Sequence, residues 1–114
     1  MTLSEIRDLL ECKVLSGEDD LSIDVQQVVA SDAMSEILAF AMSKELMITG
    51  LTNILSIRTA DIAGVAAVLY CRGKSPEKKV IEFARSKGIP MLVTKMGMFE
   101  ICGLLYSRGL KGVS

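Results

Sequence analysis

The segment at residues 65–71 reads Val65-Ala66-Ala67-Val68-Leu69-Tyr70-Cys71 and contains only apolar side chains. A continuous apolar run of this kind is typical of a β-strand that is covered on both faces. After Arg72-Gly73-Lys74 the chain continues with Ser75-Pro76-Glu77. These three residues offer a capping hydroxyl, a proline at the first helical position and an acid in the first turn, which together predict a helix start. The whole segment therefore predicts a buried strand that leads directly into a helix.

The same alternation extends in both directions along the chain. Short apolar or β-branched segments predict further strands at residues 13–15, 25–30, 46–49 and 91–94. Apolar residues at helical spacing predict helices at residues 3–12, 52–63, 76–87 and 98–108, and one more that starts after Ser31 or Asp32, either of which is a suitable cap. In the helix at 52–63, Ile54, Leu55 and Ile62 are expected to face inward. Three glycines are expected to end helices, namely Gly64, Gly88 and Gly109.

Strands that alternate with helices of about a dozen residues predict right-handed crossovers and a parallel sheet with helices on both faces. The predicted fold is therefore a three-layer α/β/α structure with a mainly parallel, five-stranded sheet. Its strands are expected to contain Val28, Ile48, Val68, Leu69 and Leu92. Residues 1–114 show no linker and no internal repeat, so we expect a single domain.

Composition excludes several classes of protein. The chain has 114 residues and a net charge of −1, which argues against general affinity for nucleic acid. Acids predominate in residues 1–36, with nine against two bases, and bases predominate in residues 37–114, with eleven against five acids. The longest apolar run spans ten residues, about half of a membrane crossing. Without an apolar leader and with an odd number of cysteines, the protein is expected to be cytoplasmic and not associated with a membrane.

Known catalytic and cofactor signatures do not fit the sequence. The chain contains no histidine, so a nucleophile paired with histidine is impossible. Gly73-Lys74-Ser75 resembles the end of a phosphate-binding loop, but Val68 stands where that motif requires glycine. Three cysteines, Cys12, Cys71 and Cys102, lie too far apart for a CxxC pair and are expected to be buried thiols. We therefore expect no catalytic residue, no metal site and no cofactor.

An anion site is the ligand chemistry that the sequence supports. In a parallel α/β sheet, ligands bind at the carboxyl ends of the strands, where helix N-termini present free amides. Three such loops carry suitable cations, hydroxyls or glycines. Their candidate ligand-binding residues are Gly50, Thr52, Asn53, Arg72, Gly73, Lys74, Ser75, Thr94 and Lys95. The alternative is that Ser75 and Asp32 only cap helices, while Arg72 and Lys74 are solvated.

The high apolar content predicts self-association. Half of the residues are apolar, and seven of them are methionines. A small three-layer domain has limited interior, so an exposed apolar patch is expected, and methionine adapts well to a self-complementary interface. The candidate interface of a homodimer consists of Met34, Leu38, Met42, Leu51 and Ile54. The alternative is that these side chains complete the core of the monomer.

Six segments in this order and spacing resemble one known family. They are 29–39 (beginning Val29-Ala30-Ser31-Asp32), 48–53 (Ile48-Thr49-Gly50-Leu51-Thr52-Asn53), 57–60 (Ile57-Arg58-Thr59-Ala60), 72–74 (Arg72-Gly73-Lys74), 88–92 (Gly88-Ile89-Pro90-Met91-Leu92) and 98–103 (Met98-Phe99-Glu100-Ile101-Cys102-Gly103). Over residues 3–110 the chain resembles the DRTGG domain family. Within that family it is similar to small stand-alone proteins encoded beside iron-only hydrogenases and to the N-terminal domain of HPr kinase/phosphorylase. Where relatives carry Gly-Asp-Arg and Thr-Gly-Gly, this chain has Gly50-Leu51-Thr52 and Cys71-Arg72-Gly73.

The resemblance implies a function as well as a fold. It implies a non-catalytic module for regulation or subunit association. Together with the three loops and the apolar content, it leads us to expect a homodimer that senses a small anionic, phosphorylated metabolite. A redox enzyme or a kinase is the kind of partner protein implied. The rival interpretation is an accessory enzyme or phosphotransfer component of a redox operon, with Cys71 or Asp32 as the reacting group. A third is an interaction protein without a small ligand.

Overall fold

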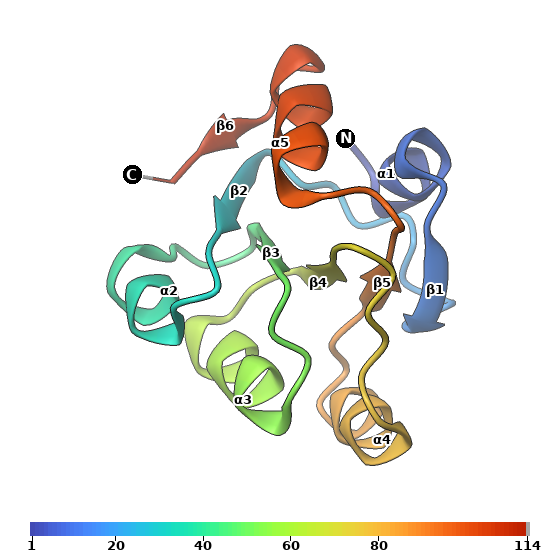
Figure 1. Cartoon of the computed structure of the whole chain (residues 1–114), viewed down its shortest axis with the longest axis vertical. Coiled ribbons are helices and arrows are strands. Elements are labelled where there is room, and N and C mark those ends of the chain that lie inside the picture. Colours follow the sequence, from blue (N-terminus) through green and yellow to red (C-terminus); the bar gives the residue numbers. More distant parts are fainter. Residues whose placement is uncertain (114) are drawn as a thin grey trace.

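The computed structural model describes residues 1–113 and contains five helices and six strands. In chain order they are α1 (Leu3–Leu10), β1 (Lys13–Ser16), β2 (Gln27–Ala30), α2 (Met34–Phe40), β3 (Leu46–Thr49), α3 (Ile54–Ala63), β4 (Ala67–Tyr70), α4 (Lys78–Ser86), β5 (Met91–Val93), α5 (Met98–Ser107) and β6 (Lys111–Gly112). Figure 1 shows them as one body with the sheet at its centre. The predicted α/β architecture is confirmed.

The sheet has the strand order β1-β5-β4-β3-β2-β6. Neighbouring strands from β5 to β6 pair in parallel, and β1 alone pairs antiparallel, with β5. The predicted five strands are all present, and β6 is a sixth that the sequence pattern did not indicate. It has only two residues, Lys111 and Gly112, both exposed, so no apolar period marks it.

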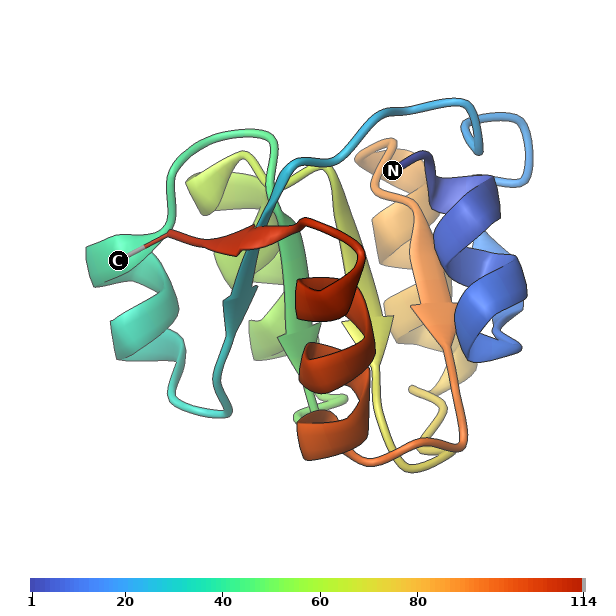
Figure 2. The ribbon, with the colours of Figure 1, turned by 90° about the horizontal axis from the view of Figure 1, so that it is seen from above.

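The two faces of the sheet are covered by different helices. On one face, α1 and α5 pack against β3, β4 and β5 in a cluster that includes Ile6, Leu69 and Ile101. On the other face, α2, α3 and α4 pack against the same strands in a cluster that includes Ile37, Val68 and Val80. Figure 2 shows the sheet between these two layers. Strands β3 and β4 are buried along their whole length, as the apolar run at residues 65–71 predicts.

The direction of the crossovers explains this division. The chain moves stepwise from β2 to β5 with α2, α3 and α4 on one face, and then returns from β5 to β6 through α5 on the other. Because crossovers between parallel strands are right-handed, a reversal of direction along the sheet moves the connecting helix to the opposite face.

The three cysteine thiols are free and differ in burial. Cys71 is fully buried, whereas Cys12 and Cys102 are half-buried against the α1 and α5 side of the core. Burial raises the pKa of Cys12 to about 12, and it also raises the pKa of Cys102. Cys12 and Cys102 are therefore expected to be protonated and unreactive near neutral pH. Within residues 1–113, no helix is both long and apolar enough to cross a membrane.

One acidic side chain lies inside the protein. Glu45, directly before β3, is only 1% exposed, and both of its carboxylate oxygens lack a hydrogen-bond partner among the described residues. Burial disfavours the charged form and raises the pKa of this carboxyl above its ordinary value of 4.5. The folded protein therefore binds the proton of this carboxyl more tightly than the unfolded chain does.

Glu45→Gln is expected to stabilise the protein at pH 7, because glutamine carries no carboxyl whose ionisation is opposed by burial. Since the pKa of Glu45 is raised on folding, wild-type stability falls as pH rises above about 4.5. The advantage of the variant should therefore shrink towards pH 4.5, as followed by urea unfolding at several pH values. Exposed Glu82→Gln is the control, and an advantage of Glu45→Gln that is equal at pH 4.5 and pH 7 would contradict the assignment.

Candidate functional site

The topology creates a crevice at the carboxyl ends of β4 and β5. From β4 the chain turns to α4 on one face of the sheet, and from β5 it turns to α5 on the other. Adjacent strands whose connections leave to opposite faces form the crevice in which α/β proteins bind their ligands. Figure 2 shows the two loops side by side along the lower edge of the sheet, the first in yellow and the second in orange. The loops at 72–75 and 94–95, predicted to bind an anion, are these two loops.

The loop after β4 is held against the loop after β5 by backbone hydrogen bonds. The N–H of Arg72 donates to the carbonyl oxygen of Met96, and the N–H of Gly73 donates to that of Thr94, both over 2.8 Å. Arg72 and Gly73 have positive φ angles of 59° and 70°. Because these two amides are already paired, the loop presents side chains to a ligand, chiefly the exposed Arg72 and Lys74.

Two glycines allow cationic side chains to lie close to the backbone at the carboxyl ends of β3 and β4. A Cβ atom on Gly50 would lie 3.5 Å from Nη2 of Arg72 and 3.4 Å from Oδ1 of Asp32. A Cβ atom on Gly73 would lie 3.8 Å from Cγ of Lys95. The guanidinium of Arg72 therefore lies beside the end of β3, and the side chain of Lys95 passes along the loop after β4. The structure thus brings Gly50, Arg72, Gly73 and Lys95 together.

Asp32 has a different role from the predicted helix cap. Its Oδ1 accepts from the N–H of Gly50 over 2.6 Å and from the hydroxyl of Thr49 over 3.1 Å. Helix α2 instead starts from Ala33 without a side-chain cap, and the nearby hydroxyl of Ser31 accepts from the N–H of Ala33. The carboxylate of Asp32 therefore links the loop after β2 to the end of β3 and helps to shape the candidate site.

A shallow hollow of about 280 Å³ lies between the starts of α3 and α4. It is lined by Thr52, Asn53 and Ser75, together with Ile54, Glu77, Lys79 and Val80. Neither helix has a side chain that caps its first turn. Ser75 is not the predicted cap of α4, because the helix begins two residues later than expected, at Lys78. Amides of both N-termini consequently remain available at this edge.

Thr94 does not face this edge. Its side chain is only 2% exposed, its hydroxyl donates to the carbonyl oxygen of Leu10 over 2.6 Å, and it accepts from the N–H of Met96. This threonine attaches the end of β5 to α1. Its predicted role in ligand binding is therefore replaced by a structural one.

Three exposed cations lie at the carboxyl ends of β4 and β5. Arg72, Lys74 and Lys95 are exposed, and the ion pairs among residues 1–113 involve other side chains. Cys71, a candidate reacting group, is fully buried, and one oxygen of Asp32 is engaged by Gly50 and Thr49. Within the described part of the chain, no group of three or more Cys, Asp or Glu side chains is placed to hold a metal ion.

The predicted dimer residues fall into two groups. Met34 is only 7% exposed and packs in the core on the α2, α3 and α4 face of the sheet, so its assignment to an exposed interface is wrong. Leu51 and Ile54 are half-buried against the same core. Leu38 and Met42 are 47% and 56% exposed, so these two remain available to a partner.

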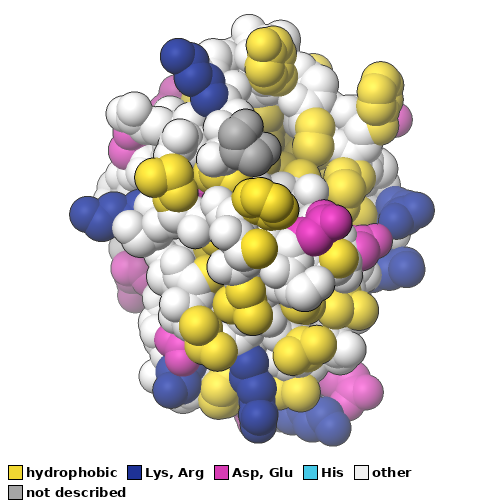
Figure 3. Space-filling model, turned by 90° about the vertical axis from the view of Figure 1, so that its left-hand side faces the viewer, with side chains coloured by type: hydrophobic (Ala, Val, Ile, Leu, Met, Phe, Trp, Pro, Cys, Tyr) yellow, Lys and Arg dark blue, Asp and Glu magenta, His cyan; other side chains and the backbone are white. Residues whose placement is uncertain are grey.

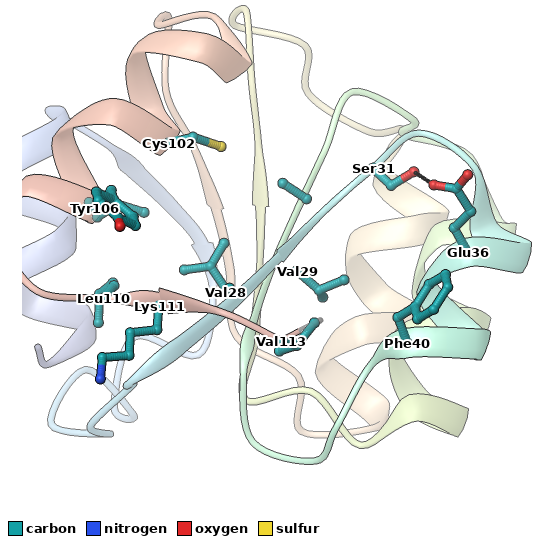
Figure 4. A pocket seen from close by; sticks show the side chains of 13 residues that line it. Val28, Val29, Ser31, Glu36, Phe40, Cys102, Tyr106, Leu110, Lys111 and Val113 are labelled. Carbon is teal, nitrogen blue, oxygen red and sulfur yellow. Dashed lines mark hydrogen bonds between the residues drawn. The ribbon is translucent and has the colours of Figure 1, made fainter.

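A second hollow, of about 440 Å³, lies along β2 and β6 at one edge of the sheet. It was not predicted from the sequence. We call it the edge groove. Figure 4 shows β2 and β6 along its floor, Phe40 of α2 on one side and Tyr106 of α5 on the other. Phe40 and Tyr106 are 56% and 76% exposed. Neither residue is one of the apolar positions that recur at helical spacing and face the core. That was the only feature of the sequence that could have indicated their exposure.

Comparisons with known proteins agree with this architecture. A family model described as the DRTGG domain matches residues 5–107. The chain is also similar to a solved structure of the CBS and DRTGG domains of the regulatory region of Clostridium perfringens pyrophosphatase, in complex with its activator diadenosine tetraphosphate. Sequence identity is 22% and the TM-score is 0.75, over 91% of this chain and 45% of that one. At this identity the likeness establishes the fold alone. No curated protein matches the chain.

Proposed function

Because the chain belongs to the DRTGG domain family, we propose that it is a non-catalytic regulatory module that binds a small phosphorylated anion. The binding site is the edge formed by Gly50, Arg72, Gly73 and Lys95, together with the uncapped N-termini of α3 and α4. One observation carries this proposal: three exposed cations lie at the topological switch point of the sheet. Ligands of α/β proteins bind at such a point, and arginine recognises phosphate through two parallel hydrogen bonds.

The similar structure supports the same ligand class. In that protein, the regulatory region that contains the CBS and DRTGG domains binds diadenosine tetraphosphate as an activator. The present chain spans just under half the length of that region. A phosphorylated nucleotide is therefore a reasonable first probe, with inorganic pyrophosphate as a test of the phosphate groups alone.

We also propose that the module acts as a homodimer. Leu38 and Met42 support this part, because both present large apolar surface to solvent at and after α2. Self-association lets a regulatory module report ligand binding to a second subunit or to a bound enzyme, since the ligand shifts the equilibrium between two arrangements. A redox enzyme or a kinase is the class of partner that the family resemblance favours.

The ligand proposal is tested by thermal unfolding with ATP, diadenosine tetraphosphate and inorganic pyrophosphate. A probe at a hundredfold excess over its Kd is expected to stabilise the fold by about 2.7 kcal/mol, equivalent to a rise of roughly 10 °C in Tm. Arg72→Ala and Lys95→Ala are each expected to weaken binding by about ten- to hundredfold, since a lost charged hydrogen bond is worth about 1.5–3 kcal/mol. Without a probe, both variants should unfold within a few degrees of the wild type.

Arg108→Ala is the matched control, because Arg108 is an exposed cation at the C-terminal end of α5, where it lies beside Met1 and Gln27 and away from the candidate site. It should bind each probe as tightly as the wild type. If Arg72→Ala and Lys95→Ala also bind as the wild type does, the proposed site is wrong. If no probe raises the Tm of the wild type, the proposal of a phosphorylated ligand fails.

A further inference from the structure

The edge groove lies where the sheet is incompletely covered. Strand β6 pairs only with Gln27 and Val28, and β2 continues beyond it to Val29 and Ala30. The N–H of Lys111 donates to Gln26 on this side of β2, whereas the N–H of Ser31 donates to Ile48 of β3 on the other. Because peptide groups alternate along a strand, the N–H and C=O of Ala30 point into the groove. An edge of this kind invites association with another chain.

Apolar side chains surround this edge from two helices. Phe40 and Tyr106 stand on opposite sides of the groove, and Val28, Val29 and Val113 lie between them. Figure 3 views the molecule from this side and shows apolar side chains across the middle of the face, with charged side chains mainly around its rim. An apolar centre within a charged rim is the arrangement found in protein interfaces.

Opposite charges mark the two ends of the edge groove. Glu36 lies at the end where β2 finishes, and its Oε2 accepts from the hydroxyl of Ser31 over 3.2 Å. Lys111 lies at the other end, where it pairs with Gln27 at the start of β2. Gln27 and Ser31 are four residues apart along an extended chain, a separation of about 13 Å. Glu36 and Lys111 take part in none of the ion pairs within residues 1–113.

This pattern of charge is complementary to itself. A two-fold axis that passes through the middle of the groove exchanges its two ends, so Lys111 of each copy then faces Glu36 of the other. An unrelated apolar ligand would carry no charges to pair with Glu36 and Lys111. A second copy of the chain carries a complementary charge for each of them.

We propose that the edge groove is the interface of the homodimer, closed by two symmetry-related contacts between Glu36 and Lys111. This inference rests on the self-association proposed above and places it at the edge groove, which Leu38 and Met42 do not line. It is independent of the anion site, because Arg72 and Lys95 lie at the carboxyl edge of the sheet and do not line the groove.

The decisive experiment is sedimentation equilibrium of four proteins at low ionic strength. Glu36→Lys places lysine against lysine across the axis, and Lys111→Glu places glutamate against glutamate. Each is expected to raise the Kd of the dimer by about tenfold or more, because two contacts become repulsive at once. The double variant Glu36→Lys with Lys111→Glu exchanges the two charges and is expected to restore the Kd to within about threefold of the wild type.

Matched controls separate the groove from the rest of the surface. Glu82→Lys and Lys78→Glu make the same charge changes on α4, on the far side of the molecule from the groove, and should leave the Kd unchanged. Phe40→Ser should weaken the dimer, whereas Phe99→Ser, at a phenylalanine that is 91% exposed outside the groove, should not. Circular dichroism confirms that each variant is folded.

The outcomes distinguish this inference from the proposed function. If neither charge reversal changes the Kd of the dimer, or if only Leu38→Lys dissociates it, the groove interface is wrong and the homodimer is still supported. A wild-type protein that stays monomeric at all accessible concentrations overturns the homodimer and the groove interface together, while the anion site is still tested by its own probes. Loss of the dimer in both single variants with recovery in the double variant supports the inference.

Discussion

Tyr70→Ala is expected to lower the free energy of unfolding by about 3–5 kcal/mol, the range for removing a large aromatic side chain from a core. Tyr70 lies on the central strand β4 and is fully buried on the face covered by α2, α3 and α4. Its hydroxyl lies 2.7 Å from Oγ of Ser56, and the hydroxyl of Ser56 donates to the carbonyl oxygen of Asn53 over 2.7 Å. Tyr70 therefore fills the core and also positions the start of α3.

Two milder variants divide this loss into its parts. Tyr70→Phe keeps the ring and removes the hydroxyl, so it should cost only about 1 kcal/mol. Ser56→Ala should cost a similar amount, because it leaves the hydroxyl of Tyr70 buried without its partner. Urea unfolding at pH 7 measures all three. A loss below about 1 kcal/mol for Tyr70→Ala would show that this part of the core is loosely packed.

Gly17→Ala is expected to destabilise the protein by about 2–4 kcal/mol, through backbone strain and overpacking. Gly17 follows β1 and has a φ of +78°, which side-chain-bearing residues adopt at a cost. A Cβ atom at this position would lie 2.7 Å from both Cα and Cβ of Pro90, directly before β5. Since the contact involves the backbone of Pro90, relief requires the segments that follow β1 and precede β5 to move apart.

Gly88→Ala is the matched control for this substitution. Gly88 has a similar φ of +67°, but nothing lies within 4 Å of the position of its Cβ atom. It should therefore lose only the conformational part, about 1 kcal/mol. The difference between the two variants in urea unfolding reports the collision with Pro90, and equal losses would show that there is none.

Local patterns predicted much of the fold because they depend on nearby residues. The alternation of strands and helices gave the correct order of five strands and five helices, and β3 begins and ends where its apolar segment does. Gly64, Gly88 and Gly109 all have positive φ, as expected of glycines that end helices. Each of these features needs only the immediate sequence.

Contacts between distant segments could not be predicted in this way. Asp32 is a good helix cap by type, yet it binds the end of β3, which lies next to it only in the folded chain. Leu55 and Ile62 were expected to face inward on α3 but are 50% and 75% exposed. Ser56 and Thr59 occupy the buried face instead, and Ser56 is suited to it because its hydroxyl bonds to Tyr70.

The candidate site likewise has features that could be predicted from the sequence and contacts that could not. The sequence identified the loops that meet at the carboxyl edge, because topology follows from the order of strands and helices. It did not show that the hydroxyl of Thr94 is used by α1, nor that Met34 is part of the core. The edge groove was missed because it depends on where β6 stops along β2, a matter of register between segments more than 80 residues apart.

The central claim is that a phosphorylated anion binds at the carboxyl edge of the sheet, and backbone amide NMR during a titration tests it most directly. With diadenosine tetraphosphate or ATP as the probe, we expect saturable shifts of the amides of Gly50, Thr52, Asn53, Gly73 and Lys95, with little change at Lys111 and Gly112 of the edge groove. Shifts that saturate only at the edge groove, or no saturable shift with any phosphorylated probe, would contradict the account.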